Sequence, residues 1–326
     1  MGEAQQDRRS LAAWRCAAQR CEEAIPLLEK VLADQPADAE VSYQLGLCYS
    51  GACRMHSLVS PPFAIAYLER ALRVIGPDGH PEFRVKALDA LGNVQRLNLR
   101  PEEALPLLEE AAALFQRLGA SEDWARTEFN LGNLCCDLAG RGAPQQWDAA
   151  IRHYRNALTV RREDTDPVRF AATVLNLGTA YRESPGEDHE ANLRRAIGCY
   201  SAAFRAYLGA HLRQKCADVH NNLGNAFLEL SSTPRAACRN TRRALRHYAL
   251  ALRARTKADR PRDYAVTQLN RGQGYLRLAG CEPEGSRQSA SRCFQEAMEG
   301  FLLCGDPTRA SLARECLSAL AGSRSG

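Results

Sequence analysis

The chain has 326 residues, 45% of them hydrophobic and 25% charged, and a formal net charge of +5 at pH 7. It contains no run of about 18 apolar residues, which excludes a membrane-spanning helix, and its opening residues lack the apolar run of a secretory signal. The 13 cysteines are odd in number and form no Cys-x-x-Cys pair. We therefore expect a cytoplasmic protein with reduced, mostly buried thiols and no metal site.

Six segments with the same pattern follow one another along the chain, each centred on a glycine. The glycines are Gly46, Gly92, Gly132, Gly178, Gly224 and Gly272, and they lie 46, 40, 46, 46 and 48 residues apart. Apolar residues around each glycine recur with the period of one helical face. A second apolar stripe follows each segment, over residues 64–72, 104–111, 150–158, 196–204, 244–252 and 290–298. The sequence therefore predicts repeated pairs of helices that stack on their neighbours.

Both ends of this array have their own patterns. A stripe over 24–32 predicts an earlier, degenerate pair whose first helix would span 10–20. A last helix is predicted over 307–321, with Leu312, Cys316, Leu317 and Leu320 on the face that covers the final pair. We expect a disordered N-terminus at 1–9, a helical array at 10–305, a capping helix at 306–321 and a disordered tail at 322–326.

The order of residues within a repeat resembles a known family. A glycine, an aromatic residue three positions later, and then Ala, aromatic and Ala in the second helix is similar to the tetratricopeptide repeat (TPR), stretched beyond its usual length of about 34 residues. The segments ASEDWARTEFNLGNL, DPVRFAATVLNLGTAY and RPRDYAVTQLNRGQGY resemble the long repeats that accompany bacterial CHAT-domain proteins. The 40-residue spacing also resembles the Pins-type spindle adaptors and kinesin light chains. Gln95 and Arg271 depart from the pattern, at an aromatic and a leucine position respectively.

The resemblance implies a fold. It is an all-α, right-handed α-solenoid of about seven helical hairpins plus a C-terminal capping helix, covering residues 10–305 before the cap. First helices of such repeats line the inner, concave wall, so their polar face would form a groove.

Asparagines dominate that face. With the glycine as position 8, position 9 holds Asn93, Asn133, Thr179 and Asn225, and position 6 holds Asn130, Asn176, Asn222 and Asn270. A carboxamide both donates and accepts hydrogen bonds, which suits the main chain of an extended peptide. In related adaptors asparagines at the position of Asn93, Asn133 and Asn225 hold bound peptide, and the resemblance implies that role here. Charged neighbours would set specificity: Lys86 and Arg126 at position 2, and Asp137, Glu183, Glu229 and Arg277 at position 13.

A structural role competes with this interpretation. Asparagine is a mediocre helix former, so a row of it inside helices has a cost that some interaction must offset. An asparagine at position 6 or 9 can also hydrogen-bond the neighbouring repeat and fix the stacking angle. The sequence leaves both roles open, and they are compatible.

Charge is unevenly distributed along the chain. Residues 1–140 contain 14 Lys/Arg and 20 Asp/Glu, whereas residues 141–326 contain 29 and 18. The densest run of cations lies between Arg235 and Arg262, and its helical phase places Arg239, Arg242, Arg246 and Arg253 on the outer, convex side. This predicts either a solvated basic surface or a docking surface for an acidic partner. Nucleic acid is disfavoured, because the interleaved aromatic residues occupy core positions.

Catalytic and cofactor motifs are missing from the sequence. The seven histidines show no ligand or triad spacing, and His153 and His247, each directly before a core tyrosine, are predicted to be on the surface. We predict a scaffold or adaptor without enzymatic activity or cofactor, which binds a protein or peptide partner in its concave groove. The alternative is a regulatory or sensing module that docks a separately encoded effector, such as a CHAT-type protease or signalling enzyme, through its basic convex face.

Overall fold

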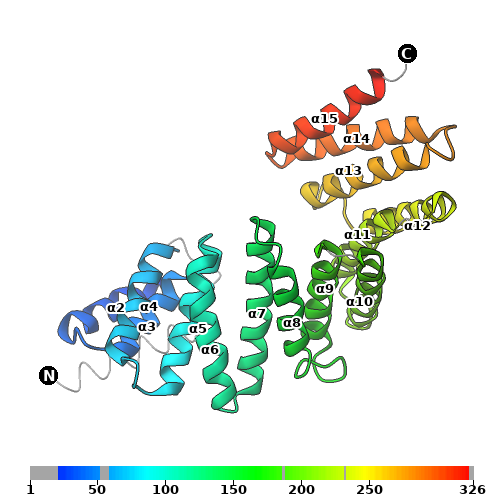
Figure 1. Cartoon of the computed structure of the whole chain (residues 1–326). Coiled ribbons are helices and arrows are strands. Elements are labelled where there is room, and N and C mark those ends of the chain that lie inside the picture. Colours follow the sequence, from blue (N-terminus) through cyan, green and yellow to red (C-terminus); the bar gives the residue numbers. More distant parts are fainter. Residues whose placement is uncertain (1–20, 52–58, 186–187, 231–232, 323–326) are drawn as a thin grey trace. The chain divides into compact units, whose positions relative to one another are not determined.

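The computed structural model describes residues 21–51, 59–185, 188–230 and 233–322, and over these ranges it is helical without a single strand (Figure 1). The chain divides into two compact units, Met1–Val160 and Arg161–Gly326. The helix predicted over 10–20 and the terminus at 1–9 lie outside the described residues, as do residues 323–326.

Each unit is a row of helical hairpins. The first unit contains α2 (Cys21–Asp34), α3 (Ala39–Tyr49), α4 (Pro61–Ile75), α5 (Pro81–Leu97), α6 (Pro101–Arg117), α7 (Ser121–Gly140) and α8 (Gln146–Ala157). The second contains α9 (Pro167–Glu183), α10 (His189–Gly209), α11 (Arg213–Glu229), α12 (Pro234–Leu252), α13 (Pro261–Leu278), α14 (Ser286–Leu303) and α15 (Pro307–Gly322). Within a unit each helix packs chiefly on its neighbours in the chain. This confirms the predicted all-α repeat fold.

Local sequence explains where the helices begin. Seven of the described helices start at a proline, whose fixed φ suits the first turn and whose missing N–H is not needed there. Asp166 caps α9 by accepting a 2.9 Å hydrogen bond from the backbone N–H of Arg169. No helix among the described residues has the length and apolar character needed to cross a membrane.

The repeated glycines are sites of close helix contact. The ring of Tyr200 on α10 lies against Gly178 on α9, and a Cβ added to this glycine would come within 2.7 Å of ring atom Cε1. The same arrangement pairs Gly132 with Tyr154, Gly224 with Tyr248 and Gly272 with Phe294, whereas leucines fill the space at Gly46 and Gly92. These aromatic rings are among the largest fully buried side chains of the chain. The glycine is therefore required by the ring that packs on it.

Helix α15 packs on α14 through three of the four residues predicted for this face, Cys316, Leu317 and Leu320, but not through Leu312. Ala310 and Ala313 are fully buried there, and Leu317 and Leu320 pack beside them. Leu312 is 46% exposed, so its predicted place on this face is wrong. Successive helical residues are about 100° apart, which turns residue 312 away from a face that contains 310, 313 and 317.

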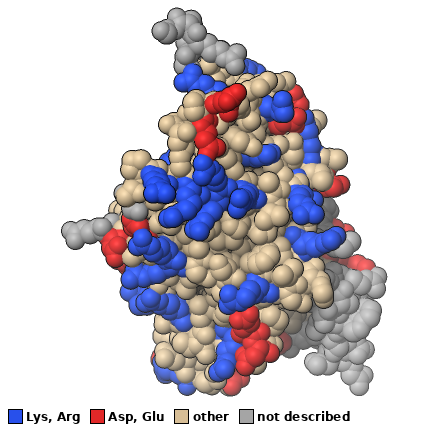
Figure 2. Space-filling view, turned by 90° about the vertical axis from the view of Figure 1, so that its right-hand side faces the viewer, with Lys and Arg blue, Asp and Glu red and all other residues tan. Residues whose placement is uncertain are grey.

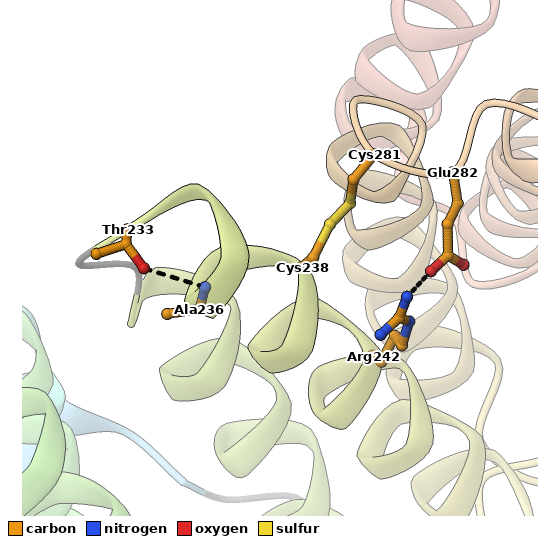
Figure 3. The surroundings of a disulfide bond; sticks show 6 residues. All are labelled: Thr233, Ala236, Cys238, Arg242, Cys281 and Glu282. Atoms are coloured by element: carbon orange, nitrogen blue, oxygen red, sulfur yellow. Dashed lines mark hydrogen bonds and ion pairs between the residues drawn. A yellow bond between two sulfur atoms is a disulfide. The ribbon is translucent and has the colours of Figure 1, made fainter.

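One pair of cysteines also departs from expectation. Cys238 on α12 and Cys281, just after α13, form a disulfide with a Cα–Cα distance of 6.5 Å (Figure 3). The prediction of reduced thiols is wrong for this pair, because both residues lie outside the core, at facing ends of neighbouring elements. Cys135, Cys216 and Cys293 are buried and unbridged, as predicted. Burial raises the pKa of the Cys135 thiol to about 12.

Two alanine substitutions in the α9–α10 hairpin test the packing of the rings. Gly178→Ala should lower the free energy of unfolding by about 1–3 kcal/mol, because its Cβ collides with Tyr200. The matched control is Gly198→Ala, on the exposed face of α10 with no neighbour in reach, which should stabilise the helix by about 0.5–1 kcal/mol. Urea unfolding measures both, and equal effects at the two glycines would contradict the packing argument.

Candidate functional site

The residue at position 9, directly after the repeated glycine, interacts with the aromatic ring that packs on that glycine in three of the repeats. The hydroxyl of Tyr154 donates to Oδ1 of Asn133 at 2.8 Å, and that of Tyr248 donates to Oδ1 of Asn225 at 2.8 Å. Thr179 and Tyr200 bring their hydroxyls to 3.3 Å. Burial raises the pKa of Tyr200 to about 12, so the phenol stays protonated. These polar residues satisfy a buried hydroxyl within their own hairpin, a role that the sequence interpretation missed.

Asn93 has a different environment from Asn133 and Asn225. Its hairpin carries Leu108 in place of the tyrosine, so there is no hydroxyl to accept. The Nδ2 of Asn93 donates to the backbone oxygen of Asp89 at 2.7 Å, one turn earlier in α5. Its carbonyl oxygen has no partner in the described part of the chain and remains able to accept a hydrogen bond.

The position 6 asparagines are half-buried, and one of them joins two repeats. Nδ2 of Asn270 on α13 lies 3.4 Å from Oδ1 of Asn221 on α11, a long hydrogen bond between successive first helices. This is the stacking contact that the sequence left open. For Asn130, Asn176 and Asn222 a role in the groove stays a prediction.

Position 13 residues are also used between or beside repeats. Arg96 on α5 pairs with Asp137 on α7 at 3.3 Å, and Arg182 on α9 pairs with Glu229 on α11 at 2.9 Å. Arg182 also contacts Glu183, and Arg277 donates to the backbone oxygen of Leu228. The sequence analysis did not consider Arg96 and Arg182, which occupy position 12 of their helices. Each reaches a position 13 carboxylate in the next repeat. Burial raises the pKa of the Glu229 carboxyl, and Arg182 opposes that shift.

A pocket in the first unit brings three predicted groove residues together. It has a volume of about 340 Å³ and is walled by the first helices α3, α5 and α7. Lys86 and Asn93 of α5 and Arg126 of α7 line it. Tyr43 adds a hydroxyl, and Leu47, Val94 and Leu97 supply apolar wall. The arrangement can hold one side chain of a partner beside polar main-chain contacts.

The polar wall of this pocket is ordered around Asp89. Thr127 donates to its Oδ1 at 2.8 Å, and Nη2 of Arg126 lies 3.3 Å from its Oδ2. Burial raises the pKa of the Asp89 carboxyl, while Arg126 and Thr127 oppose the shift. In contrast, Lys86 is exposed and forms no ion pair with any described residue. The pocket therefore offers the Lys86 ammonium and the Asn93 carbonyl oxygen to a ligand, whereas Arg126 is paired with both Asp89 and Asp123.

The basic face is smaller than the sequence suggested. Arg239 and Arg246 on α12, and Arg253 directly after it, are exposed without an ion pair to the described residues, but Arg242 pairs with Glu282 (Figure 3). Arg255 is buried and donates to Asp218 and Thr267, each at 2.7 Å, joining α11 to α13. Lys257 contacts Glu296 and Glu299 on α14. A broad cluster of Lys and Arg side chains nevertheless remains on one face (Figure 2).

His153 and His247 are half-buried, whereas the sequence predicted them on the surface. Nδ1 of His153 lies 3.0 Å from Oε2 of the buried Glu128, at position 4 of α7. His247 occupies the same place in its hairpin and meets His220, at position 4 of α11, with 3.1 Å between their Nδ1 atoms. The residue before the second-helix tyrosine thus faces the first helix. Among the described residues no three His, Cys, Asp or Glu side chains are grouped for metal binding.

Aromatic rings enclose the pair of imidazoles in the second unit. The ring of Phe204 lies 4.8 Å from that of His220, and the ring of Phe227 is stacked on His247 at 5.5 Å. Burial lowers the pKa of His220, and burial together with His220 lowers the pKa of His247 to about 4. Both imidazoles are therefore neutral at pH 7 and can share a proton in one hydrogen bond.

No protein-family model matches the sequence, and no curated protein matches it. Solved structures match the fold. RapI in its apo form superposes with a TM-score of 0.58 over 91% of this chain and 97% of its own, at 12% identity. BtubC (BKLC) from P. vanneervenii covers 82% of this chain and 93% of its own at 20% identity, with a TM-score of 0.48. YrrB, described as a TPR protein with an unusual peptide-binding site, covers 60% and 83% at 20% identity, with a TM-score of 0.43.

The likeness to RapI shows a shared fold, since identity is only 12%. The other two superpositions, with TM-scores of 0.48 and 0.43, carry no argument. The narrower resemblance to CHAT-associated repeats and to Pins-type or kinesin-light-chain adaptors stays a prediction.

A mutant cycle tests the role of the position 9 carboxamide. Asn225→Ala should lower the free energy of unfolding by about 1–3 kcal/mol, because it leaves the buried hydroxyl of Tyr248 without an acceptor. Adding Tyr248→Phe should recover much of this loss, which urea unfolding of the four proteins measures. Asn222→Ala on the same helix is the control and should lower the free energy of unfolding by less. Equal costs for the two asparagines would rule out the structural role.

The histidine pair predicts a dependence of stability on pH. Because the folded-state pKa of His247 lies below its unfolded value, the stabilisation is complete above pH 6.5 and is lost as the pH falls towards about 4. Urea midpoints measured across this range should therefore drop more steeply for the wild type than for His247→Phe. Parallel curves for the two proteins would contradict the geometry of the pair.

Proposed function

We propose that this tetratricopeptide-like repeat protein is a protein-interaction scaffold that binds a segment of a protein partner in the groove between α3, α5 and α7. The observation that carries the proposal is the 340 Å³ pocket in which Lys86, Asn93 and Arg126 meet. These three were selected from the sequence by their positions in the repeat. Their convergence on one concave pocket supports a binding role.

The pocket is suited to an extended segment with one anchoring side chain. Asn93 has a carbonyl oxygen available to accept a main-chain N–H, and Lys86 has an ammonium available to a carboxylate. Leu97 is 67% exposed at the pocket wall, so a partner that covers it gains apolar contact. The proposed ligand is therefore a peptide with a carboxylate next to an apolar side chain.

The other asparagines have a smaller part in this proposal. Asn133 and Asn225 each use the carbonyl oxygen of their carboxamide inside the hairpin, and the amide group of Asn225 is the part that could meet a peptide. A groove role for Asn130, Asn176, Asn222 and Asn270 extends the proposal along the first helices. No reaction is assigned to the chain.

A regulatory module remains the second candidate. Arg239 and Arg246 on α12, and Arg253 directly after it, are exposed and unpaired, which favours docking of an acidic effector on that side of the second unit. Raising the salt concentration should weaken docking on the exposed arginines much more than binding in the pocket. Exposed charges are screened within about 10 Å at 0.1 M ionic strength, whereas apolar contacts in a pocket are not.

Selection of peptides from a random display library on the full chain tests the groove. Peptides recovered should bind Lys86→Glu with Asn93→Ala at least tenfold more weakly than the wild type, because both polar contacts are lost, as measured by fluorescence anisotropy. The charge-matched control Lys30→Glu, exposed on α2, should bind normally. Circular dichroism should show unchanged helicity for all variants. Undiminished binding to the double variant would refute the assignment.

A further inference from the structure

A larger cavity lies in the second unit, on the side of the second helices. Its volume is about 620 Å³, and it is formed by the C-terminal ends of α10 and α12 and the first half of α11. Its lining combines Phe204, Leu208 and Leu250 with Arg213 and Arg253, and no acidic residue takes part. None of the groove residues of the first unit lines it, whereas Arg253 belongs both to this cavity and to the arginine surface of the second candidate function.

The apolar part of the cavity is open to solvent. Leu208 is 56% exposed and Leu250 is 39% exposed, both near the end of a second helix. Phe204 lies one turn before Leu208 on α10 and packs on the His220 ring at 4.8 Å. Two exposed leucines beside an aromatic ring form an apolar surface that gains free energy when a partner covers it.

The cations at the cavity have no counter-charge. Arg213 and Arg253 are exposed, and neither forms an ion pair with the described residues. The nearby Arg255 and Arg260, in contrast, both pair with Asp218, so this carboxylate is not available to Arg213 or Arg253. Arg246, one turn before Leu250, is exposed and unpaired as well. The rim therefore carries excess positive charge beside an apolar surface.

The walls of the cavity are held together by hydrogen bonds. Nε2 of Gln214, at the start of α11, donates to the backbone oxygen of Ala254 after α12 at 3.2 Å. Nη1 of Arg260 donates to Oε1 of the same Gln214 at 3.1 Å. These bonds fix the start of α11 against the end of α12. A ligand would meet a preformed cavity and lose less entropy on binding.

We propose that this cavity binds an acidic segment of a protein partner that carries one large apolar side chain. The apolar side chain enters against Phe204, Leu208 and Leu250, while flanking carboxylates pair with Arg213 and Arg253. Exposed ion pairs alone are weak in salt, so the apolar anchor supplies most of the affinity and the arginines supply orientation and charge selection. This inference goes beyond the groove in the first unit and does not depend on it.

The test uses the full chain and fluorescein-labelled pentapeptides in which Phe, Leu or Trp stands between pairs of Glu. Anisotropy should detect binding of at least one of them at protein concentrations up to about 1 mM. Two matched peptides, with Ala as the anchor or with Lys flanks, should bind at least tenfold more weakly. The imidazole signals of His211 and His220, which line the cavity, should shift in NMR spectra on addition of the bound peptide.

Variants localise the binding. Arg213→Glu with Arg253→Glu, and separately Leu208→Asp, should weaken binding at least tenfold while circular dichroism shows an intact fold. The control pair Arg287→Glu with Arg292→Glu changes the same charge at exposed arginines of α14, outside the cavity, and should change affinity less than about twofold. The groove variant Lys86→Glu with Asn93→Ala should bind normally, which separates failure of this proposal from failure of the groove.

Several results would overturn the proposal. No binding by any of the acidic peptides would do so, as would equal binding of the Ala-anchored peptide, which indicates charge attraction alone. An equal loss in the control pair would place the interaction outside the cavity. Stronger competition by a single-stranded oligonucleotide than by unlabelled peptide would identify a nucleic-acid surface instead.

Discussion

The contact of an aromatic ring with a glycine determines much of this structure. Tyr200 packs directly on Gly178, and this close approach of two helices is possible only without a side chain on the first. The ring then buries its hydroxyl, which needs a partner, and the residue after the glycine supplies it. The glycine allows the ring to pack closely, and the polar residue accepts the hydrogen bond of the ring's buried hydroxyl, so the three residues depend on one another. Where Leu108 replaces the aromatic ring, no buried hydroxyl needs an acceptor. Asn93, the residue after the glycine, lines a pocket there.

Polar contacts join one repeat to the next. Arg96 reaches Asp137 and Arg182 reaches Glu229 at equivalent places in the two units, and the buried Arg255 ties Asp218 to Thr267. Apolar stripes alone allow neighbouring hairpins to slide or rotate, whereas an ion pair or a buried guanidinium fixes one register. Charged residues used in this way are not available to a partner. Counting charges in the sequence therefore overstates the basic surface of the second unit.

The sequence was sufficient for features that depend on local order. Glycine spacing and apolar stripes predicted the helices and their pairing, because both follow from contacts within one hairpin. Features that depend on the register between hairpins were missed or misplaced. Cys238 and Cys281 are 43 residues apart, close to one repeat length, yet only the stacking shows that they meet. The pairing of Arg96 with Asp137 required the same information, whereas His247 and His220 meet within one hairpin and were missed because the residue before the tyrosine was assigned to the wrong face. On α15 only Leu312 was assigned to the wrong face, because the closest contacts there are made by Ala310 and Ala313, which the apolar stripe did not single out.

The two proposed binding sites differ in their chemistry, and the charge of each unit accounts for part of the difference. The first unit contains 17 Lys/Arg and 21 Asp/Glu, so a cation such as Lys86 stands in a largely acidic surrounding, where long-range attraction of an acidic partner is weak. The proposed binding in the first unit must therefore rely on short-range hydrogen bonds, such as one accepted by the carbonyl oxygen of Asn93. The second unit contains 26 and 17, and its unpaired arginines can attract an acidic segment from a distance. In the two proposals, therefore, charge selects the partner of the second unit, whereas hydrogen-bond geometry selects the partner of the first.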